Sequence, residues 1–180
     1  MLANYLDRGF STFFYGIILA IVMIPLFLGV KILLGKKNSI TPLNTIAEVA
    51  WVAIVLSILS ITGILGGQFG TTSLIEGTAV ISFDFLAEGL SMATILNIIL
   101  FIPFGFLSAI VFKRIQTKWI YGILIGLLFT SLIEFLQTFT GRFVQIDDII
   151  MNTLGTYLGY TLCIYGLKFK PLKPLKRITD

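Results

Sequence analysis

Long apolar runs without a charged residue alternate along the chain with short polar segments that are mostly basic. A helix of about 20 apolar residues crosses the hydrocarbon layer of a bilayer, so each uncharged run is long enough to span it. One further run, which begins at Trp119, is interrupted only by Glu134. The uncharged runs are Gly9–Val30, Val49–Ile75, Gly89–Phe112 and Ile149–Leu167. The pattern therefore predicts an integral membrane protein.

We expect an all-α, polytopic membrane helix bundle with five transmembrane helices. The first run is about twice as long as the apolar core of a signal peptide, so we interpret it as a span of the mature protein. All 180 residues are expected to form a single membrane domain, 1–180. The expected helices are Phe10–Leu34, Ala47–Leu65, Met92–Phe112, Trp119–Phe139 and Ile149–Leu167.

The positions of Lys and Arg predict the orientation, because these residues accumulate in cytoplasmic connections. Eleven of the thirteen lie near the first connection, near the third connection or in the C-terminal tail. The connection over residues 66–91 has no basic residue, and the one over residues 140–148 has only Arg142. We therefore expect the N-terminus outside and the C-terminal tail in the cytoplasm, where its basic residues contact anionic membrane lipids.

The composition narrows the chemistry that the protein can perform. Hydrophobic residues make up 57% of the chain and charged residues 12%, which is too apolar for a soluble domain. The absence of histidine excludes an imidazole base and a histidine-ligated zinc site, so any general base must be a carboxylate. The single cysteine, Cys163, excludes an intrachain disulfide. The net charge is +4, but the Lys and Arg residues flank the expected spans. They therefore indicate membrane topology, and we expect no nucleic-acid partner.

Glu134 is the only ionisable residue well inside an expected helix. Because placing an ionisable side chain inside a bilayer costs free energy, Glu134 is a candidate functional residue. It precedes the expected outer end of its helix by five residues, which places it about 7.5 Å deep. A stripe of small residues on the same face should contact protein and not lipid. This stripe consists of Thr130, Gly126 and Gly122, and a similar stripe in the last helix consists of Gly155 and Gly159.

The expected topology brings other polar residues to the outer level of Glu134. The helices at 92–112 and 149–167 both start outside, and the short connection at 140–148 holds the outer ends of its two helices together. We therefore expect one polar pocket near the outer face, with Glu134 as the candidate catalytic residue. The candidate ligand-binding residues are Asn97, Gln137, Arg142, Asp147, Asp148 and Asn152.

Each candidate also has a purely structural interpretation. Asp147 and Asp148 directly precede an apolar run, where N-caps and charges that favour the helix dipole belong. Arg142 can be the counter-ion of a carboxylate, and Asn97 and Asn152 can form hydrogen bonds between helices. We assign no metal ligand and no resident cofactor, although the two aspartates could hold Mg²⁺.

Several short motifs follow one another between about residues 79 and 167. They are the run Asn97–Leu107, Glu134–Gln137, Gly141–Arg142, Asp147–Asp148 and Asn152–Tyr160. In this order they resemble the VanZ-like family of bacterial membrane proteins. One departure is Gln145, because the family often has an aspartate at this position. The loss of that carboxylate disfavours an acidic metal site in this connection.

The resemblance implies a multi-pass protein of the bacterial cell membrane, related to one that raises resistance to the glycopeptide teicoplanin. Such a drug has a lipid tail and attacks cell-wall precursors outside the membrane, on the side that the expected pocket faces. Our first hypothesis is a non-enzymatic factor that binds a lipid-linked cell-wall precursor or a lipoglycopeptide, with Arg142 holding a phosphate or carboxylate. The second is an enzyme acting on a lipid headgroup or envelope precursor, with Glu134 as general base or acid. Ion-coupled or proton-coupled transport ranks last, because Glu134 lies near one side of the membrane.

Overall fold

The computed structural model describes the part of the chain that contains the expected polar pocket. The described residues are 11, 14–18, 21–22, 24, 28–29, 32–33, 42–65, 70, 81–82, 85, 89, 91–112, 116, 118–140 and 144–168. Much of the expected first helix, Phe10–Leu34, and the basic tail after residue 168 lie outside the described residues.

Helices form at the predicted apolar runs within this described part. α4 begins after Ser91, whose hydroxyl accepts a hydrogen bond of 3.2 Å from the backbone N–H of Thr94 and so caps the helix. It then continues without interruption through Pro103. The helices are α2 (Pro42–Ile61), α4 (Met92–Val111), α5 (Ile120–Thr138) and α6 (Ile146–Lys168). Their ends differ from the predicted ends by at most five residues.

Three of the described helices are long and apolar enough to cross a membrane, namely α4, α5 and residues Leu43–Ile61 of α2. α6 is as long, but its sequence includes Asn152, three threonines and three tyrosines, which lower its hydropathy. The chain is therefore a mostly helical membrane protein, as predicted. The number of spans and their orientation remain predictions.

The tightest packing in the fold is between α4 and α6. Gly155 of α6 lies against the carbonyl oxygen of Ile98, and Gly159 lies against that of Ile102. Because the partners advance by four residues together, α4 and α6 run in the same direction. Helices in a bilayer gain no hydrophobic free energy by associating, so close contact through small residues is what holds them. This confirms the packing role predicted for the two glycines.

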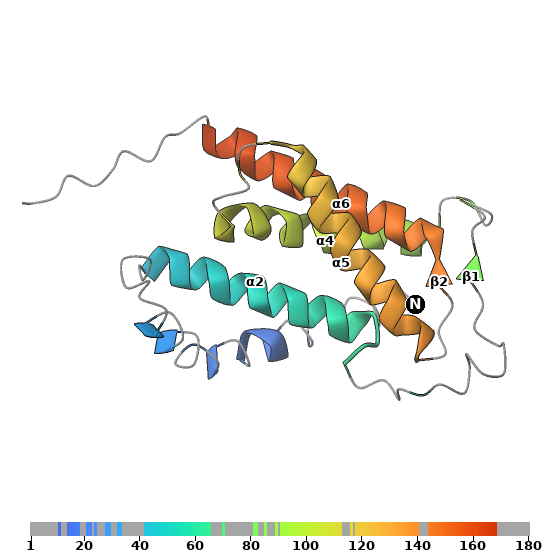
Figure 1. Cartoon of the computed structure of the whole chain (residues 1–180), viewed down its shortest axis with the longest axis horizontal. Helices are drawn as coiled ribbons and strands as arrows, with labels where there is room; N and C mark the ends of the chain where they lie inside the picture. Colours follow the sequence, from blue (N-terminus) through green and yellow to red (C-terminus); the bar gives the residue numbers. More distant parts are fainter. Residues whose placement is uncertain are drawn as a thin grey trace, which may run out of the picture.

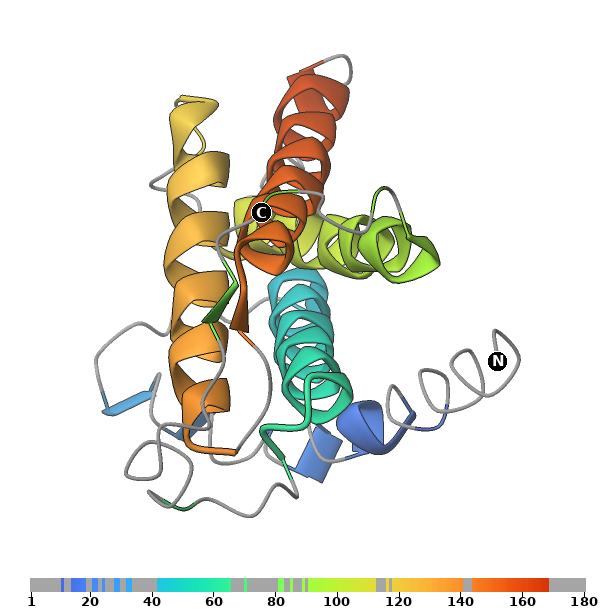
Figure 2. The same cartoon turned by 90° about the vertical axis from the view of Figure 1, so that its right-hand side faces the viewer.

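α5 packs along the same helix α6 but in the opposite direction. A Cβ at Gly122 would lie 2.9 Å from the side chain of Tyr160, and a Cβ at Gly126 would lie 2.9 Å from Thr156. The stripe of Gly122, Gly126, Thr130 and Glu134 is buried, as predicted from its spacing. In Figures 1 and 2, α4 lies between α6 and α2, with α5 beside them.

Aromatic side chains join α2 to this group of helices. Phe104 of α4 stacks on Phe129 of α5 with ring centroids 4.5 Å apart. The indole N–H of Trp51 in α2 donates a hydrogen bond of 2.8 Å to the hydroxyl of Ser108, and its ring packs against Phe104. α2 is therefore fixed against α4 by ring contacts together with one satisfied polar group.

A short parallel strand pair, which the sequence did not predict, closes one end of the fold. β1 (Ile81–Ser82) pairs with β2 (Val144–Gln145), so that Ile81 is opposite Val144 and Ser82 is opposite Gln145. Parallel strands need a long crossover connection, and here α4 and α5 provide it. The pair ties the connection at residues 66–91 to the connection before α6, beside the first turn of α6 (Figure 1).

The contact between α4 and α6 predicts a contrast between two glycines of the same helix. Gly159→Ala should lower the stability of the protein by about 1–3 kcal/mol, because its new methyl group meets the backbone carbonyl of Ile102 and the helices must separate. Gly166→Ala is the matched control, since a Cβ there meets nothing within 4 Å. Thermal unfolding of both variants in detergent measures the difference, and equal melting temperatures would contradict the close approach.

Candidate functional site

The register between α5 and α6 fixes the level of Glu134. Gly126 faces Thr156, and one turn further along Thr130 accepts a hydrogen bond of 3.0 Å from the side-chain amide of Asn152. Each step of four residues along α5 thus matches a step of four residues back along α6. The next step places Glu134 level with Asp148. The Glu134 side chain is only 3% exposed, so this carboxylate is inside the fold.

A direct side-chain contact brings α4 to the same level. The amide nitrogen of Asn97 donates a hydrogen bond of 2.5 Å to a carboxylate oxygen of Asp148. The two residues are 51 positions apart in the sequence, and both are partly buried. Asn97 and Asp148 both lie near the start of their helices. Because α4 and α6 run in the same direction, the two starts lie at the same end of the bundle and the contact can form.

Gln137 links the end of α5 to the end of α2. Its amide nitrogen donates a hydrogen bond of 2.8 Å to the backbone oxygen of Thr62, one residue beyond the last residue of α2. The carbonyls at a helix end have no partner within the helix, so this bond satisfies one of them. Beside it, the backbone N–H of Gly70 donates a hydrogen bond of 2.9 Å to the carbonyl of Phe139. The ends of α2 and α5 are therefore tied together.

Asp147 and Asp148 lie in the first turn of α6, one and two residues after the start of the helix at Ile146. The sequence placed the helix start at Ile149, so the two aspartates are not in front of the helix but within it. Carboxylates in the first turn stabilise the positive end of the helix dipole. Asp148 combines this role with the contact to Asn97.

The structure therefore places the described candidates at one end of the bundle. We call Asn97, Glu134, Gln137, Asp147, Asp148 and Asn152 the polar cluster. Arg142, the remaining candidate, lies outside the described residues. Within the cluster, contacts or register connect residues from α4, α5 and α6. Their roles in binding or catalysis remain predictions.

Several buried oxygen atoms in and beside the cluster accept no hydrogen bond from the protein. Among the described residues they include Oε1 of Gln137, Oδ1 of Asn152 and Oγ1 of Thr153. The nitrogen atoms of Gln137 and Asn152 both donate to protein oxygens. Buried polar atoms normally have a partner, so these acceptors suit donor groups of a ligand or of ordered water.

Three threonines contribute to this region although the sequence did not assign them to the site. Thr130 receives the Asn152 amide, Thr62 supplies a backbone oxygen, and Thr153 holds a buried hydroxyl. The position of Thr130, four residues before Glu134, was a usable signal. A backbone oxygen such as that of Thr62 leaves no signal in the residue type.

The described residues do not form a conventional metal centre. No group of three or more His, Cys, Asp or Glu side chains within them could hold a metal ion. Mg²⁺ accepts one or two carboxylates when waters or substrate phosphates complete its shell. A Mg²⁺ ion on Asp147 and Asp148 therefore requires ligands from a substrate or from water.

Comparison with known proteins identifies similar sequences. The sequence profile of one family, described as VanZ/LLP1, matches residues 12–167. The chain is also 37% identical, over 94 residues, to Protein VanZ of Enterococcus faecium. This match covers 51% of the chain and 55% of the relative, so it spans about half the length of each protein. No solved structure matches the chain.

The contact between Asn97 and Asp148 predicts an energetic coupling between α4 and α6. In a double-mutant cycle with Asn97→Ala and Asp148→Ala, we expect a coupling of about 0.6–1.7 kcal/mol, the magnitude found for hydrogen bonds between helices in a membrane. Unfolding of the four proteins in detergent micelles measures it. Strictly additive effects of the two substitutions would show that the contact contributes nothing to stability.

Proposed function

The chain belongs to the VanZ/LLP1 family, and from this premise we propose that it lowers susceptibility to teicoplanin-type glycopeptides from within the cell membrane. In this proposal the polar cluster is the end of an outward-facing pocket that binds a lipid-linked or amphiphilic envelope molecule. The observation that carries the proposal is the bond from Asn97 to Asp148 at the level of the buried Glu134. It joins two helices in the part of the chain where unsatisfied oxygens also collect.

The proposed topology has five spans, with the N-terminus outside and the C-terminal tail in the cytoplasm. The helix directions support it, because α4 and α6 run one way and α5 runs the other. In a five-span chain with the N-terminus outside, the polar cluster lies at the external ends of its helices. The positions of Lys and Arg in the sequence support the same orientation.

The chemistry of the cluster suits the polar head of an amphiphile. Its unsatisfied oxygens accept hydrogen bonds from hydroxyl, amide or ammonium groups, which are abundant in glycopeptides and in cell-wall precursors. Arg142 follows α5 by four residues and would hold a phosphate or carboxylate of the same molecule. Binding without chemical conversion would change what a glycopeptide can reach at the membrane surface.

An enzyme is the second candidate, because two carboxylates on facing helices share one level. Glu134 is buried and Asp148 lies opposite it in the register of α5 and α6. In this alternative Glu134 is the general base or acid for a reaction of a lipid headgroup or envelope precursor. Mg²⁺ on Asp147 and Asp148 would position a phosphate of that substrate.

Glu134→Gln tests the role of the carboxylate, since glutamine keeps the volume and removes the charge. We expect cells carrying this variant to lose most of the protection against teicoplanin. The minimum inhibitory concentration, compared at matched protein levels, measures this loss. Glu48→Gln on α2 is the control, because Glu48 is half-buried outside the cluster, and we expect it to keep full protection. Full protection by Glu134→Gln would refute a role for the carboxylate.

The two candidate functions differ in what happens to the bound molecule. Purified protein incubated with labelled envelope lipids and Mg²⁺ should leave every lipid unchanged if it acts by binding alone. A converted lipid whose formation stops in Glu134→Gln would establish the enzyme and replace the binding proposal. Thin-layer chromatography and mass spectrometry of the extracted lipids decide between them.

The proposed orientation is tested with single cysteines in a Cys163→Ser background. A membrane-impermeant maleimide should label Phe85→Cys in intact cells, because Phe85 is 51% exposed in the connection on the polar side. Lys118→Cys, in the exposed turn before α5, should be labelled only after the cells are opened. The reverse pattern would overturn the orientation and place the polar cluster at the cytoplasmic face.

A further inference from the structure

Acidic residues belong mainly to the end of the bundle that holds the polar cluster. The connection over residues 66–91 is held at this end, because Gly70 bonds to Phe139, β1 pairs with β2, and Ser91 caps α4. Arg142 is the only basic residue in the segments 62–97 and 134–152, which contain the cluster and its connections. Their acidic residues are Glu76, Asp84, Glu88, Glu134, Asp147 and Asp148. With Arg142 included, these segments have an excess of negative formal charge.

A buried amide oxygen lies close to two of these carboxylates. Asn152 follows Asp148 by four residues on α6. Its amide nitrogen donates to Thr130, which precedes Glu134 by four residues on α5. The Asn152 side chain therefore lies between the two helices, one turn away from both carboxylates. It is only 3% exposed, yet its Oδ1 accepts no hydrogen bond from the protein, and neither does the buried Oγ1 of Thr153.

Negative charge and unsatisfied acceptors together favour a cation that donates hydrogen bonds. A primary ammonium group carries one positive charge and three N–H donors, and it has no acceptor. A hydroxyl or amide group has a donor but does not compensate the charge, and a quaternary ammonium compensates the charge but has no N–H. A divalent metal ion fits less well, because no group of three or more His, Cys, Asp or Glu side chains in the described part of the chain could hold one.

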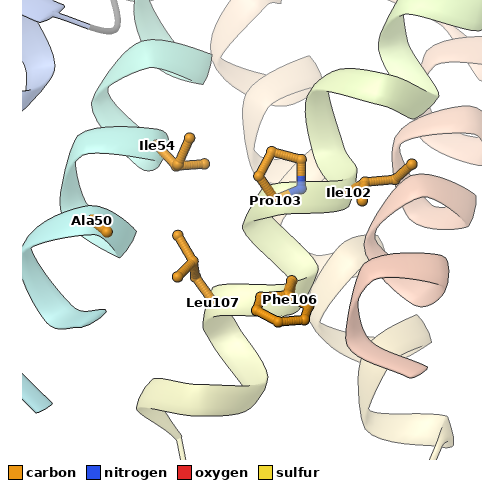
Figure 3. Close-up of a pocket in the computed structure, with 6 residues that line it drawn as sticks. All are labelled: Ala50, Ile54, Ile102, Pro103, Phe106 and Leu107. Atoms are coloured by element: carbon orange, nitrogen blue, oxygen red, sulfur yellow. The ribbon is translucent and has the colours of Figure 1, made fainter. Parts of the chain in front are cut away.

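An apolar groove between α2 and α4 does not offer this chemistry. Figure 3 shows its two walls, which α2 and α4 form. Its residues on α4 face α2, whereas Asn97 of the same helix faces α6. The lining residues are Ala50, Ile54, Ile102, Pro103, Phe106 and Leu107. All six are apolar, so recognition of a charged head falls to the polar cluster.

We propose that the polar cluster binds the primary ammonium group of its amphiphilic ligand. The inference rests on the proposed function and deepens it, because it names the chemical group that the site recognises. Asp148 and Glu134 compensate the charge, and Oδ1 of Asn152 accepts one N–H of the ammonium group. Asp147 and Asp148 are partly exposed, so the ligand approaches along the first turn of α6.

The test compares three phospholipids that have the same acyl chains and differ at the head-group nitrogen. Phosphatidylethanolamine has a primary ammonium, phosphatidylcholine has a quaternary ammonium without an N–H donor, and N-acetyl-phosphatidylethanolamine has no positive charge. Native mass spectrometry of the full chain, released from detergent micelles, measures the affinity for each lipid. We expect phosphatidylethanolamine to bind about tenfold more tightly than either of the other two.

Two variants that each remove one negative charge without changing size give a matched pair. Asp148→Asn should remove most of the tenfold preference, while its side-chain oxygen can still accept the hydrogen bond from Asn97. Glu48→Gln, on α2 outside the cluster, should keep the preference. Both variants must show the melting temperature of the parent protein. If one does not, the comparison of the three lipids in the unmodified chain decides alone.

The ammonium group can belong to an envelope lipid or to the glycopeptide, and competition distinguishes these sources. If teicoplanin displaces phosphatidylethanolamine and N-acetylated teicoplanin does not, the amine of the glycopeptide occupies the site. If neither displaces it, the site takes the amine of a lipid. Both results support recognition of a primary ammonium.

Equal affinities for the three lipids would overturn the inference. Displacement of phosphatidylethanolamine by micromolar Mg²⁺ or Ca²⁺ would also overturn it, because it would show a metal site in place of an ammonium site. In either case, a loss of protection in Glu134→Gln would leave the proposed function standing. A clear preference for phosphatidylethanolamine together with full protection by Glu134→Gln would support the ammonium site and count against the proposed function.

Discussion

The close approach of the α4 and α6 backbones is the constraint on which the other positions depend. Gly155 and Gly159 leave no side chain between the helices, so carbonyl groups of α4 lie directly on α6. This contact sets the parallel direction and the register that bring Asn97 to Asp148. α5 then packs on another face of α6 through glycines of its own, and the level of Glu134 follows from that second register. The position of the polar cluster is thus a consequence of backbone packing at the glycines, further along the same helices.

The lipid environment makes hydrogen bonds between the helices important for stability. A polar group that faces hydrocarbon without a partner costs several kcal/mol, so the side-chain nitrogens of Asn97, Gln137 and Asn152 all donate to protein oxygens. The oxygens that are left over are buried at the same end of the bundle. These remaining acceptors can be satisfied by donor groups of a ligand or of ordered water.

Hydropathy and spacing predicted most of the described fold. A span needs length and low charge, close packing between helices needs a stripe of small residues, and all three are local properties of the sequence. The convergence of Glu134 with Asp148 was predictable from topology, since helix direction alternates at each crossing. The specific pair Asn97–Asp148, the start of α6 at Ile146 and the pairing of β1 with β2 were not. Each depends on a register between distant segments, and hydropathy carries no information on register.

The burial of the polar cluster assigns recognition to the polar head of an amphiphilic ligand. A hydrocarbon chain that moves from the bilayer onto the apolar surface of the helices exchanges one hydrocarbon environment for another, so it gains little hydrophobic free energy. Hydrogen bonds to buried oxygens are stronger in a low-dielectric site than in water. In the proposed function, discrimination between ligands should therefore reside in the polar heads that contact the cluster.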